Sequence, residues 1–422
     1  MAQFTVNTDQ GDFIYETDGC ALRGPDGELV DLSAFGYTQY LLGVPTDNGQ
    51  EQFSSAAPML GKVQPRILKI QLGLGCNYSC SYCSQGGQVE DKTSRADAQE
   101  FLDGIDSWLT DPPHKIEFWG GEPLLYWKKI KMLAPTLREK FPLARLSIVT
   151  NGTLLTLERA HWMHELGFSI AVSHDGPGQA RRGEDPFAKS DWSEVIRAVA
   201  DLFGERFSFN TVITPGNHDL FSIANWFWER MGREVKVNVE DVVTDYVGAA
   251  WTERELSALE RSMHDQVASG LAFAFPRIAW SAQQFVESLV VGKPLAGSQQ
   301  VCGMDRKDQL AVDLKGTVLT CQNVGAGSGH AIGTVDRLED VKLAAHPWPT
   351  RKNCSVCPVV HLCYGSCMLL ADNTPEFKAS CAASYHYNMG ILSGIIQRIT
   401  GATVRAVRGR TPGKFIPIRM VA

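Results

Sequence analysis

The sequence lacks the features that would place it in a membrane, outside the cell or on a nucleic acid. No apolar run approaches the ~20 residues that a membrane-spanning helix needs. The first residues, MAQFTVNTDQGDF, contain neither the basic stretch nor the apolar stretch of a secretory signal. The net charge is -7, so there is no large basic field to hold a phosphate backbone. These absences predict a cytoplasmic protein that has neither a membrane nor a nucleic acid as its partner.

Internal repeats and low-complexity tracts are also missing, whereas cysteine is abundant. The chain has 422 residues, of which 44% are hydrophobic, and this length allows a large core and two or three domains. It contains eleven cysteines, and only Cys20 stands far from any other. Because the cytoplasm is reducing, spacing this tight argues for metal sites rather than disulfides.

Strand-like and helix-like patterns alternate from residue 66 to about residue 250. The strand candidates are 67–73, 115–119, 145–150, 168–173, 206–214 and 235–240. The helix candidates lie near 94–109, 126–140, 156–166, 190–204 and 219–230, and the first carries an apolar stripe of Phe101, Leu102, Ile105, Trp108 and Leu109. This alternation indicates a parallel sheet of six crossover units, two short of a closed barrel. Active sites of such sheets lie at the carboxyl ends of the strands.

Three cysteines follow the first of these strands, in the segment GLGCNYSCSYCSQGG. Their spacing is Cys76-x3-Cys80-x2-Cys83. Iron–sulfur clusters are held by closely spaced thiolates, usually four, so three leave one iron open for reaction. A zinc loop or a group of buried thiols is the alternative interpretation.

This loop, with Tyr82 before its last cysteine, resembles that of the radical S-adenosylmethionine (SAM) superfamily. The resemblance implies that SAM chelates the open iron of a [4Fe–4S] cluster. One electron then splits SAM, and the resulting 5'-deoxyadenosyl radical abstracts a hydrogen atom from the substrate.

Three further segments resemble motifs of the same superfamily at the ends of the next strands. WGGEP (119–123) resembles the motif that holds the SAM amino group, and VTNGTLL (149–155) and VSHDGPG (172–178) resemble positions that face its ribose and carboxylate. For the arginine that binds the carboxylate, Arg181 and Arg182 are the alternatives. The predicted SAM contacts are Tyr82, Gly120, Gly121, Glu122, Asn151 and Ser173.

The later cysteines resemble a SPASM domain, which carries two auxiliary [4Fe–4S] clusters. The resemblance implies an outer cluster on Cys354, Cys357, Cys363 and Cys381, and an inner cluster on Cys302, Cys321 and Cys367. Relatives with a closed inner cluster have an extra cysteine shortly after the first, and this chain has none. The inner cluster therefore has an open iron or a ligand of another kind. Cys20 is either that ligand or a quiet buried thiol, and a zinc knuckle is the alternative for 354–367.

The expected fold is α/β: a partial (β/α)6 radical SAM barrel with a small N-terminal strand-rich segment and a C-terminal cysteine-rich SPASM domain. The expected parts are a strand-rich segment (1–62), the barrel (63–250), a helical bridge (251–300), the SPASM domain with its two clusters (301–390), and a C-terminal helix and basic tail (391–422). Within them, 11–19 and 27–33 look like strands, 45–58 reads as a linker, and the tail from about 403 is expected to be disordered.

Auxiliary clusters imply an oxidation, because they can accept the second electron of a dehydrogenation or a new bond. The resemblance makes a peptide the expected substrate. We therefore predict a maturase of ribosomally made precursor peptides that forms an oxidative intrapeptide cross-link, with a carbon–carbon cyclophane-type bond ahead of a thioether. The alternatives are a sulfatase-maturase-like oxidation of Ser or Cys to formylglycine, and a small-molecule substrate. The formylglycine activity needs an Asp after the second SPASM cysteine, where this chain has Gln322.

The catalytic base and the protein partners are less constrained. Glu240, Asp241 and Asp245 follow the sixth strand and are the candidate bases, with the first two preferred, whereas His174 and His218 are expected to be structural. An electron donor such as a flavodoxin or ferredoxin is expected. A leader peptide would bind a separate protein or the edge of the N-terminal strands. From other classes, an electron carrier would not need the SAM motifs, and a structural zinc protein would be colourless.

Overall fold

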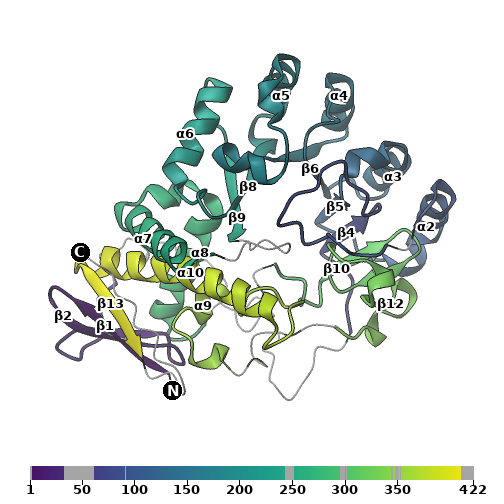
Figure 1. The fold of residues 1–422 in the computed structure, drawn as a ribbon. Coiled ribbons are helices and arrows are strands. Elements are labelled where there is room, and N and C mark those ends of the chain that lie inside the picture. The colour runs from purple at the N-terminus through teal and green to yellow at the C-terminus, as the bar shows by residue number, and fades with distance from the viewer. Residues whose placement is uncertain are drawn as a thin grey trace.

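The computed structural model describes residues 2–32, 61–90, 92–242, 251–294, 300, 302–343, 346, 351 and 353–409. Three sequence expectations fall outside these residues: the linker at 45–58, Asp245, and the tail from residue 410 onwards. Figure 1 shows an arc of helices around a curved sheet, with a smaller sheet and a long helix beside it.

The larger sheet contains the six predicted strands, in chain order and all parallel. They are β4 (Ile67–Gln71), β5 (Lys115–Trp119), β6 (Arg145–Thr150), β7 (Phe168–Ser173), β8 (Phe207–Ile213) and β9 (Val237–Val242). The helices between them are α2 (Arg95–Trp108), α3 (Trp127–Lys140), α4 (Leu157–Glu165), α5 (Ser190–Phe203) and α6 (Leu220–Met231). The predicted partial (β/α)6 barrel is confirmed, and the carboxyl ends of its strands meet at one edge.

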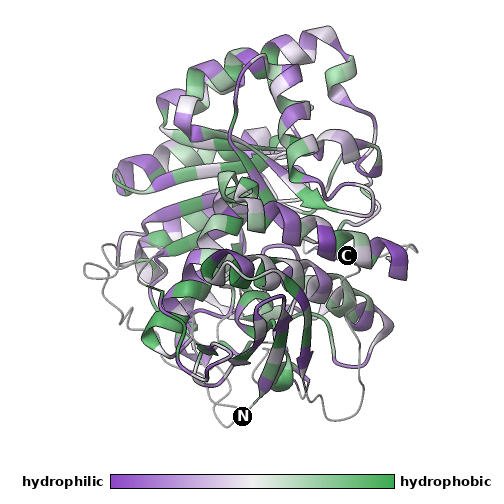
Figure 2. Ribbon diagram, turned by 90° about the vertical axis from the view of Figure 1, so that its left-hand side faces the viewer, coloured by the Kyte–Doolittle hydropathy of each residue, from purple (hydrophilic) through white to green (hydrophobic). Residues whose placement is uncertain are grey.

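The barrel helices form where apolar residues recur at helical spacing behind a capped first turn. Helix α2 begins at a capping box, in which the side chains of Ser94 and Asp97 each accept the other's backbone N–H. The predicted stripe from Phe101 to Leu109 is buried against the sheet and the neighbouring helix. Full burial of one such side chain, Ile105, contributes about 1.5–3 kcal/mol. Figure 2 shows this alternation as green and purple bands along the helices.

Three strands from the cysteine-rich region extend the barrel sheet, which the sequence did not predict. They are β10 (Gln309–Asp313), β11 (Thr317–Leu319) and β12 (Ala331–Thr334). Strand β10 pairs in parallel with β4, the first strand of the barrel, and β11 and β12 follow in antiparallel order. Strands β10 to β12 thus extend the sheet beyond β4, the first strand of the barrel (Figure 1). Thr320 and Cys321 follow β11 in the sequence.

The two ends of the described chain share a second sheet of order β13-β1-β2-β3. Its strands are β1 (Gln3–Thr8), β2 (Gly11–Glu16), β3 (Ala21–Arg23) and β13 (Val404–Gly409). The prediction of a disordered tail is thus wrong for residues 404–409. These residues form a strand that pairs with β1, and buried residues such as Val404 recur along it. The strand expected at 27–33 is not found in its described part, residues 27–32, where after the Gly24–Gly27 turn only Leu29 makes a bridge, to Arg23.

Long helices join the second sheet to the barrel. They are α7 (Glu253–Ser269), α8 (Pro276–Val291) and α10 (Pro375–Thr400), with the short α9 (Val360–Cys363) beside them. The helical character predicted for 251–300 is confirmed for α7 and α8. Helix α10 crosses the boundary drawn at 390/391 and packs closely on α7, because a Cβ at Gly390 would lie 2.4 Å from the Glu260 carbonyl oxygen. Tyr15 of β2 packs edge to face on Phe285 of α8, with 5.7 Å between ring centroids.

Short 3-10 helices occupy several of the connections. They are η2 (Pro123–Tyr126), η3 (Gly176–Arg181), η4 (Pro186–Ala188), η5 (Gly204–Arg206), η6 (Leu271–Ala274), η7 (Ala326–Ser328), η8 (Val335–Asp340) and η10 (Cys354–Val356). Among the helices of the described residues, none combines the length and the apolar character needed to cross a bilayer.

Candidate active site and cysteine clusters

The three-cysteine loop lies directly after β4, at the carboxyl edge of the barrel sheet. Cys76 is exposed, Cys80 and Cys83 are half-buried, and the Cys83 N–H donates to the Cys80 carbonyl at 3.1 Å. Burial raises the pKa of Cys80 to about 11, Arg182 opposes this rise, and the neighbouring thiols of Cys83 and Cys76 add to it. The three thiols therefore lie close enough to interact electrostatically.

The glycines of the WGGEP segment let this loop approach the end of β5. The Gly121 N–H donates to the Gly73 carbonyl at 3.0 Å, and the Glu122 N–H donates to the Gly75 carbonyl at 2.9 Å. A Cβ at Gly121 would lie 2.3 Å from the carbonyl oxygen of Leu74, closer than real contacts allow. Only glycine fits this position without moving the backbone of the cysteine loop.

The carboxylate of Glu122 braces the same turn against the end of β6. Glu122 is fully buried, and its oxygens accept hydrogen bonds from the Thr150 hydroxyl at 2.7 Å, the Asn151 N–H at 2.7 Å and the Leu124 N–H at 2.8 Å. Burial raises the pKa of this carboxyl group, and the three hydrogen bonds act in the opposite direction. Both oxygens are thus engaged within the protein, and a contact of this side chain with SAM stays a prediction.

The predicted ribose and carboxylate positions differ in how close they lie to the cysteine loop. The Asn151 amide donates to the Asn77 side chain at 2.8 Å and lies 4.0 Å from the Cys76 sulfur. Ser173 ends β7, is half-buried and pairs in register with Asn210 of β8. Asn151 therefore belongs to the wall of the loop, whereas Ser173 lies further round the strand edge.

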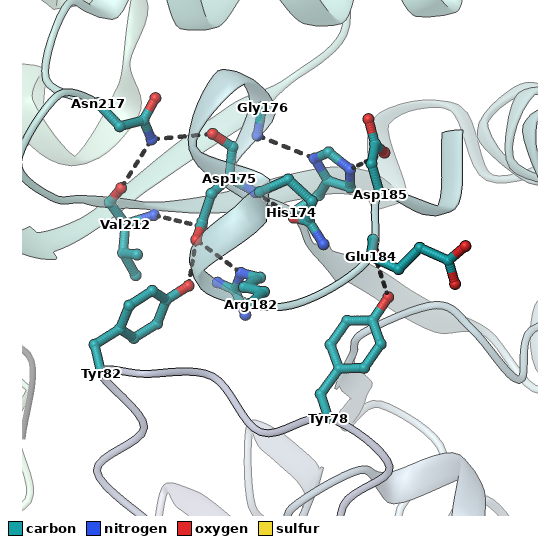
Figure 3. A network of polar contacts seen from close by, with 11 residues as sticks. Tyr78, Tyr82, His174, Asp175, Gly176, Arg182, Glu184, Asp185, Val212 and Asn217 are labelled. Atoms are coloured by element: carbon teal, nitrogen blue, oxygen red, sulfur yellow. Dashed lines mark hydrogen bonds and ion pairs between the residues drawn. The ribbon is translucent and has the colours of Figure 1, made fainter. Parts of the chain in front are cut away.

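A buried network around Asp175 fastens the cysteine loop to the ends of β7 and β8 (Figure 3). The Tyr82 hydroxyl donates a short hydrogen bond to the Asp175 carboxylate, which also pairs with Arg182 at 3.0 Å and accepts the Val212 N–H at 3.1 Å. Burial lowers the pKa of Arg182, but Asp175 and its other neighbours outweigh this and raise it overall. The guanidinium lies 5.5 Å from the centre of the Tyr82 ring.

This network holds Arg182, one of the two arginines considered for the SAM carboxylate, and adds a residue that the sequence interpretation missed. Which arginine binds SAM stays a prediction. Arg182, rather than Arg181, is the arginine held beside Tyr82 and Cys80. Asp175 has no exposed surface, and the only sequence signal for it was an aspartate in the DGP turn after β7. The Tyr78 hydroxyl adds a second attachment, to the Glu184 carbonyl at 3.2 Å (Figure 3).

The histidines and acidic residues at the strand ends have structural partners. His174 accepts the Gly176 N–H at its Nδ1 and lies 3.1 Å from Asp185, and burial lowers its pKa, so it is held neutral. Burial also lowers the pKa of His218, for which no partner of Nδ1 occurs in the described part of the chain. Glu240 accepts the Asn210 amide at 3.1 Å and lies 3.7 Å from Arg277.

Of the two preferred candidate bases, only Glu240 has a side chain that the structure describes. Glu240 lies at the sheet edge and is already engaged by an amide and a cation. The backbone of Asp241 is part of β9, but its side chain lies outside the described structure. The role of a base stays a prediction for both.

The inner set of cysteines meets beside the extended edge of the sheet. Burial raises the pKa of Cys302 to about 11 and that of Cys321 to about 12, and Cys367 adds to both rises. Cys321 packs in a small buried cluster with Met304, Ala311, Leu319, Val324 and Met368. The Cys321 thiol donates to the Gln322 side-chain oxygen at 3.4 Å, so the residue in the position of the sulfatase-maturase base accepts a hydrogen bond.

The outer set of cysteines surrounds one cavity of about 390 Å³. Cys354, Cys357, Cys363 and Cys381 all line it, together with the side chains of Arg351, Asp372 and Tyr385. Burial raises the pKa of all four thiols, to about 11 for Cys354 and about 12 for Cys357. Three of these cysteines come from the loops and short helices around α9, and the fourth from the first turns of α10.

Cys20 lies near the outer set rather than the inner set. Its thiol is buried and donates to the Thr17 carbonyl at 3.6 Å, and burial raises its pKa to about 12. The same carbonyl accepts a hydrogen bond from His361 of α9 at 2.8 Å. The idea that Cys20 completes the inner set has no support from this position.

The cysteine sets supply the kind of ligand that iron–sulfur clusters need. Across the ranges that the structure covers, no three His, Cys, Asp or Glu side chains gather as they would around one ion. A [4Fe–4S] cluster is larger and is bound by thiolates spread around it. Four cysteines around one cavity, and three on a loop cradled by glycines, fit such a group.

Comparison with known proteins agrees with this geometry. Residues 70–219 match the family model of the Radical SAM superfamily. The radical SAM cyclopropyl synthase TigE of Paramaledivibacter caminithermalis is 21% identical over 72% of this chain and 68% of the relative. A serine-type anaerobic sulfatase-maturating enzyme of Klebsiella aerogenes is 29% identical over 40% of this chain and 44% of the relative, so the match spans less than half of that enzyme.

The fold is also similar to that of solved structures. Native anSMEcpe with bound AdoMet superimposes with a TM-score of 0.56 and 17% identity, covering 79% of this chain and 99% of that chain. At this identity the likeness supports the fold alone. The family match implies SAM and one [4Fe–4S] cluster as cofactors.

Proposed function

Residues 70–219 are a radical SAM domain, and from this premise we propose that the protein is an oxidative peptide maturase. The observation that carries the proposal is the grouping of ten cysteines into three sets. One set lies at the barrel edge, where the chemistry starts, and two lie in the C-terminal region, where an electron can be received. An enzyme that only generated a radical would not need the second and third sets.

In the proposed reaction the substrate loses two hydrogen atoms. The first leaves as a hydrogen atom to the 5'-deoxyadenosyl radical, which forms when one electron splits SAM into that radical and methionine. The second leaves as a proton and an electron when the substrate radical closes its new bond. One SAM is consumed per bond, and the released electron goes to an auxiliary cluster.

The cysteine sets would divide this work. Cys76, Cys80 and Cys83 would hold the cluster that binds SAM, because their loop is partly exposed and leaves one iron open. The four outer cysteines would hold a closed cluster, and the three inner cysteines a cluster with one iron free of cysteine. Asn151 and Arg182 lie on the walls of the first site and are the side chains best placed to hold the bound nucleotide.

A carbon–carbon intrapeptide bond is the favoured product. A relative that matches 72% of this chain is by name a cyclopropyl synthase, and a cyclopropyl ring needs a new carbon–carbon bond. A thioether is second, because the inner set could leave an iron for a substrate thiolate. The substrate is proposed to be a ribosomally made precursor peptide, since the sulfatase-maturating relative also acts on a protein chain.

Formylglycine formation is the second candidate, favoured by the match to a serine-type anaerobic sulfatase-maturating enzyme. The residue after Cys321 argues against it, because the Gln322 amide cannot take up a proton at neutral pH. An electron donor such as a flavodoxin or ferredoxin is proposed to supply the first electron, and a separate protein or the N-terminal sheet edge to bind a leader.

The test is co-expression with a short peptide encoded by a neighbouring reading frame, followed by mass spectrometry. The proposal expects the peptide to lose the mass of two hydrogen atoms, with fragments that locate the bond between two side chains. Cys76→Ala should abolish the change. Cys20→Ala is the matched control, since this buried thiol belongs to none of the three sets, and it should leave the product unchanged. A methyl gain, or conversion of Ser or Cys to formylglycine, would overturn the proposal.

A further inference from the structure

Two lysines share one glutamate on the inner face of the barrel. Lys69 of β4 lies 3.2 Å from Glu117 of β5, and Lys115 makes a short ion pair with the other oxygen of the same carboxylate. The side chains of Lys69 and Glu117 are only 11% and 13% exposed. The trio therefore carries one positive charge more than its carboxylate neutralises, in a place where unbalanced charge is costly.

Lys69 faces the segment that carries the inner cysteines. In the parallel pairing of β4 with β10, Lys69 is the register partner of Ala311, so both side chains lie on the same face of the sheet. Ala311 packs in the small buried cluster that contains Cys321. The ammonium of Lys69 also lies 5.5 Å from the ring of Trp119, whose Nε1 donates to Asn323 at 2.8 Å.

The neighbouring contacts fix this segment relative to Lys69. Gln71, two residues further along β4, donates to the carbonyl oxygens of Gln322 and Val324, both at 2.9 Å. The backbone on each side of Asn323 is thus fastened to the strand that carries Lys69.

Lys115 provides a natural comparison within the same trio. It contacts the same carboxylate, but its register partner on β4 is Ile67, two residues before Lys69. It therefore lies about 6–7 Å further from the carboxyl edge of the sheet.

We propose that Lys69 is a positioning residue for electron transfer, which keeps the reduction potential of the inner auxiliary cluster high enough to accept the electron of the substrate radical. The inference rests on the proposed function, because it needs a cluster on Cys302, Cys321 and Cys367. Reduction adds one negative charge to a group already bound by three thiolates. A buried cation beside it stabilises the reduced form more than the oxidised form and so raises the potential.

The test is a redox titration of the anaerobically reconstituted protein, followed by electron paramagnetic resonance. All samples carry Cys76→Ala, so that the signal of the SAM cluster does not overlap. Lys69→Met should shift the midpoint potential of the inner cluster to a lower value. Lys69→Arg, which keeps the positive charge, should give a midpoint potential close to that of the protein with Lys69. Lys115→Met, the matched control, should shift it less than Lys69→Met. If Lys69→Met does not accumulate as folded protein, Lys69→Gln carries the same test.

Iron analysis separates failure of this inference from failure of the proposed function. If the inner cluster is present but its potential is the same in wild type and Lys69→Met, the role of Lys69 is overturned while the proposed function stands. If the wild-type protein binds only about eight irons, as two clusters would, and shows no inner-cluster signal, the three-cluster proposal fails and the inference falls with it.

Discussion

The cysteine loop after β4 and the outer cysteine cavity use the same side chain to build two different kinds of site. The loop offers three cysteines and depends on contacts from β5, β6 and β7 to hold its shape, and each set has one exposed cysteine, Cys76 in the loop and Cys381 in the outer set. The outer set closes four thiols around a cavity of about 390 Å³. An open site suits a cluster that must bind and split a cosubstrate, and a closed site suits one that only stores an electron. In the proposed function, the number of cysteines in each set, three in the loop and four around the cavity, therefore assigns the reacting cluster to the loop.

The largest expected effect separates these two roles. Cys76→Ala should reduce 5'-deoxyadenosine formation to the level of the enzyme-free control, because the cluster that splits SAM loses a ligand. Cys381→Ala should abolish the cross-linked product but leave reductive cleavage of SAM, since it opens only the outer set. Liquid chromatography of reactions with dithionite measures both products. Equal loss of 5'-deoxyadenosine in the two variants would show that the two sets are not functionally distinct.

The second-largest effect is expected where the WGGEP turn approaches the cysteine loop. Gly121→Ala places a Cβ within 2.4 Å of two carbonyl oxygens of the cysteine loop, so the backbone must move. We expect a loss of about 3 kcal/mol in stability and weaker iron binding. Gly104→Ala in α2 is the control, because its Cβ would meet nothing within 4 Å and should stabilise the helix by about 0.5–1 kcal/mol. Calorimetry and iron analysis give both numbers, and a Gly121→Ala protein as stable as wild type would contradict the tight approach.

The two tyrosines of the cysteine loop allow a finer test of how the open site is held. Tyr82→Phe removes a buried hydrogen bond to a carboxylate, and we expect a loss of about 1.5–3 kcal/mol together with weaker SAM binding. Tyr78→Phe removes a hydrogen bond to a neutral carbonyl, worth about 0.5–1.5 kcal/mol. Thermal unfolding and equilibrium binding of SAM compare them. Equal losses would mean that the Asp175 network is no more important than a surface contact.

The smallest expected effect is a pH dependence at the same edge. Burial lowers the pKa of His174 in the folded protein, so the unfolded chain binds the extra proton more readily. Stability that depends on neutral His174 should therefore be present above its ordinary pKa and be lost as the pH falls below it. We expect the melting temperature to drop more between pH 7.5 and pH 5.5 in wild type than in His174→Gln. The same drop in both proteins would exclude His174 as a source of the dependence.

The comparison also shows where sequence reasoning succeeded. The strands β5, β6 and β7 were predicted to the residue, because a buried strand repeats its apolar pattern locally and is bounded by turn residues. The glycines of WGGEP were predicted as SAM contacts from the family resemblance, which stays a prediction, and their approach to the cysteine loop was found only in the structure.

The remainder depends on contacts between distant parts of the chain. Strand β10 joins β4 across more than two hundred residues, and no local pattern marks such a partner. The sequence of β13 alone resembles a basic tail, and it forms a strand because it pairs with β1. In the sequence, Asp175 lies within an ordinary turn motif. Its role becomes visible only through its contacts with Tyr82 and Arg182 in the folded protein.

The most direct test of the central claim is electron–nuclear double resonance of the reduced protein with SAM labelled with nitrogen-15 in its amino group. If the loop after β4 leaves one iron open, the labelled nitrogen should show a hyperfine coupling to the reduced cluster in wild type and none in Cys76→Ala. A reduced cluster that shows no coupling at saturating SAM would contradict the account.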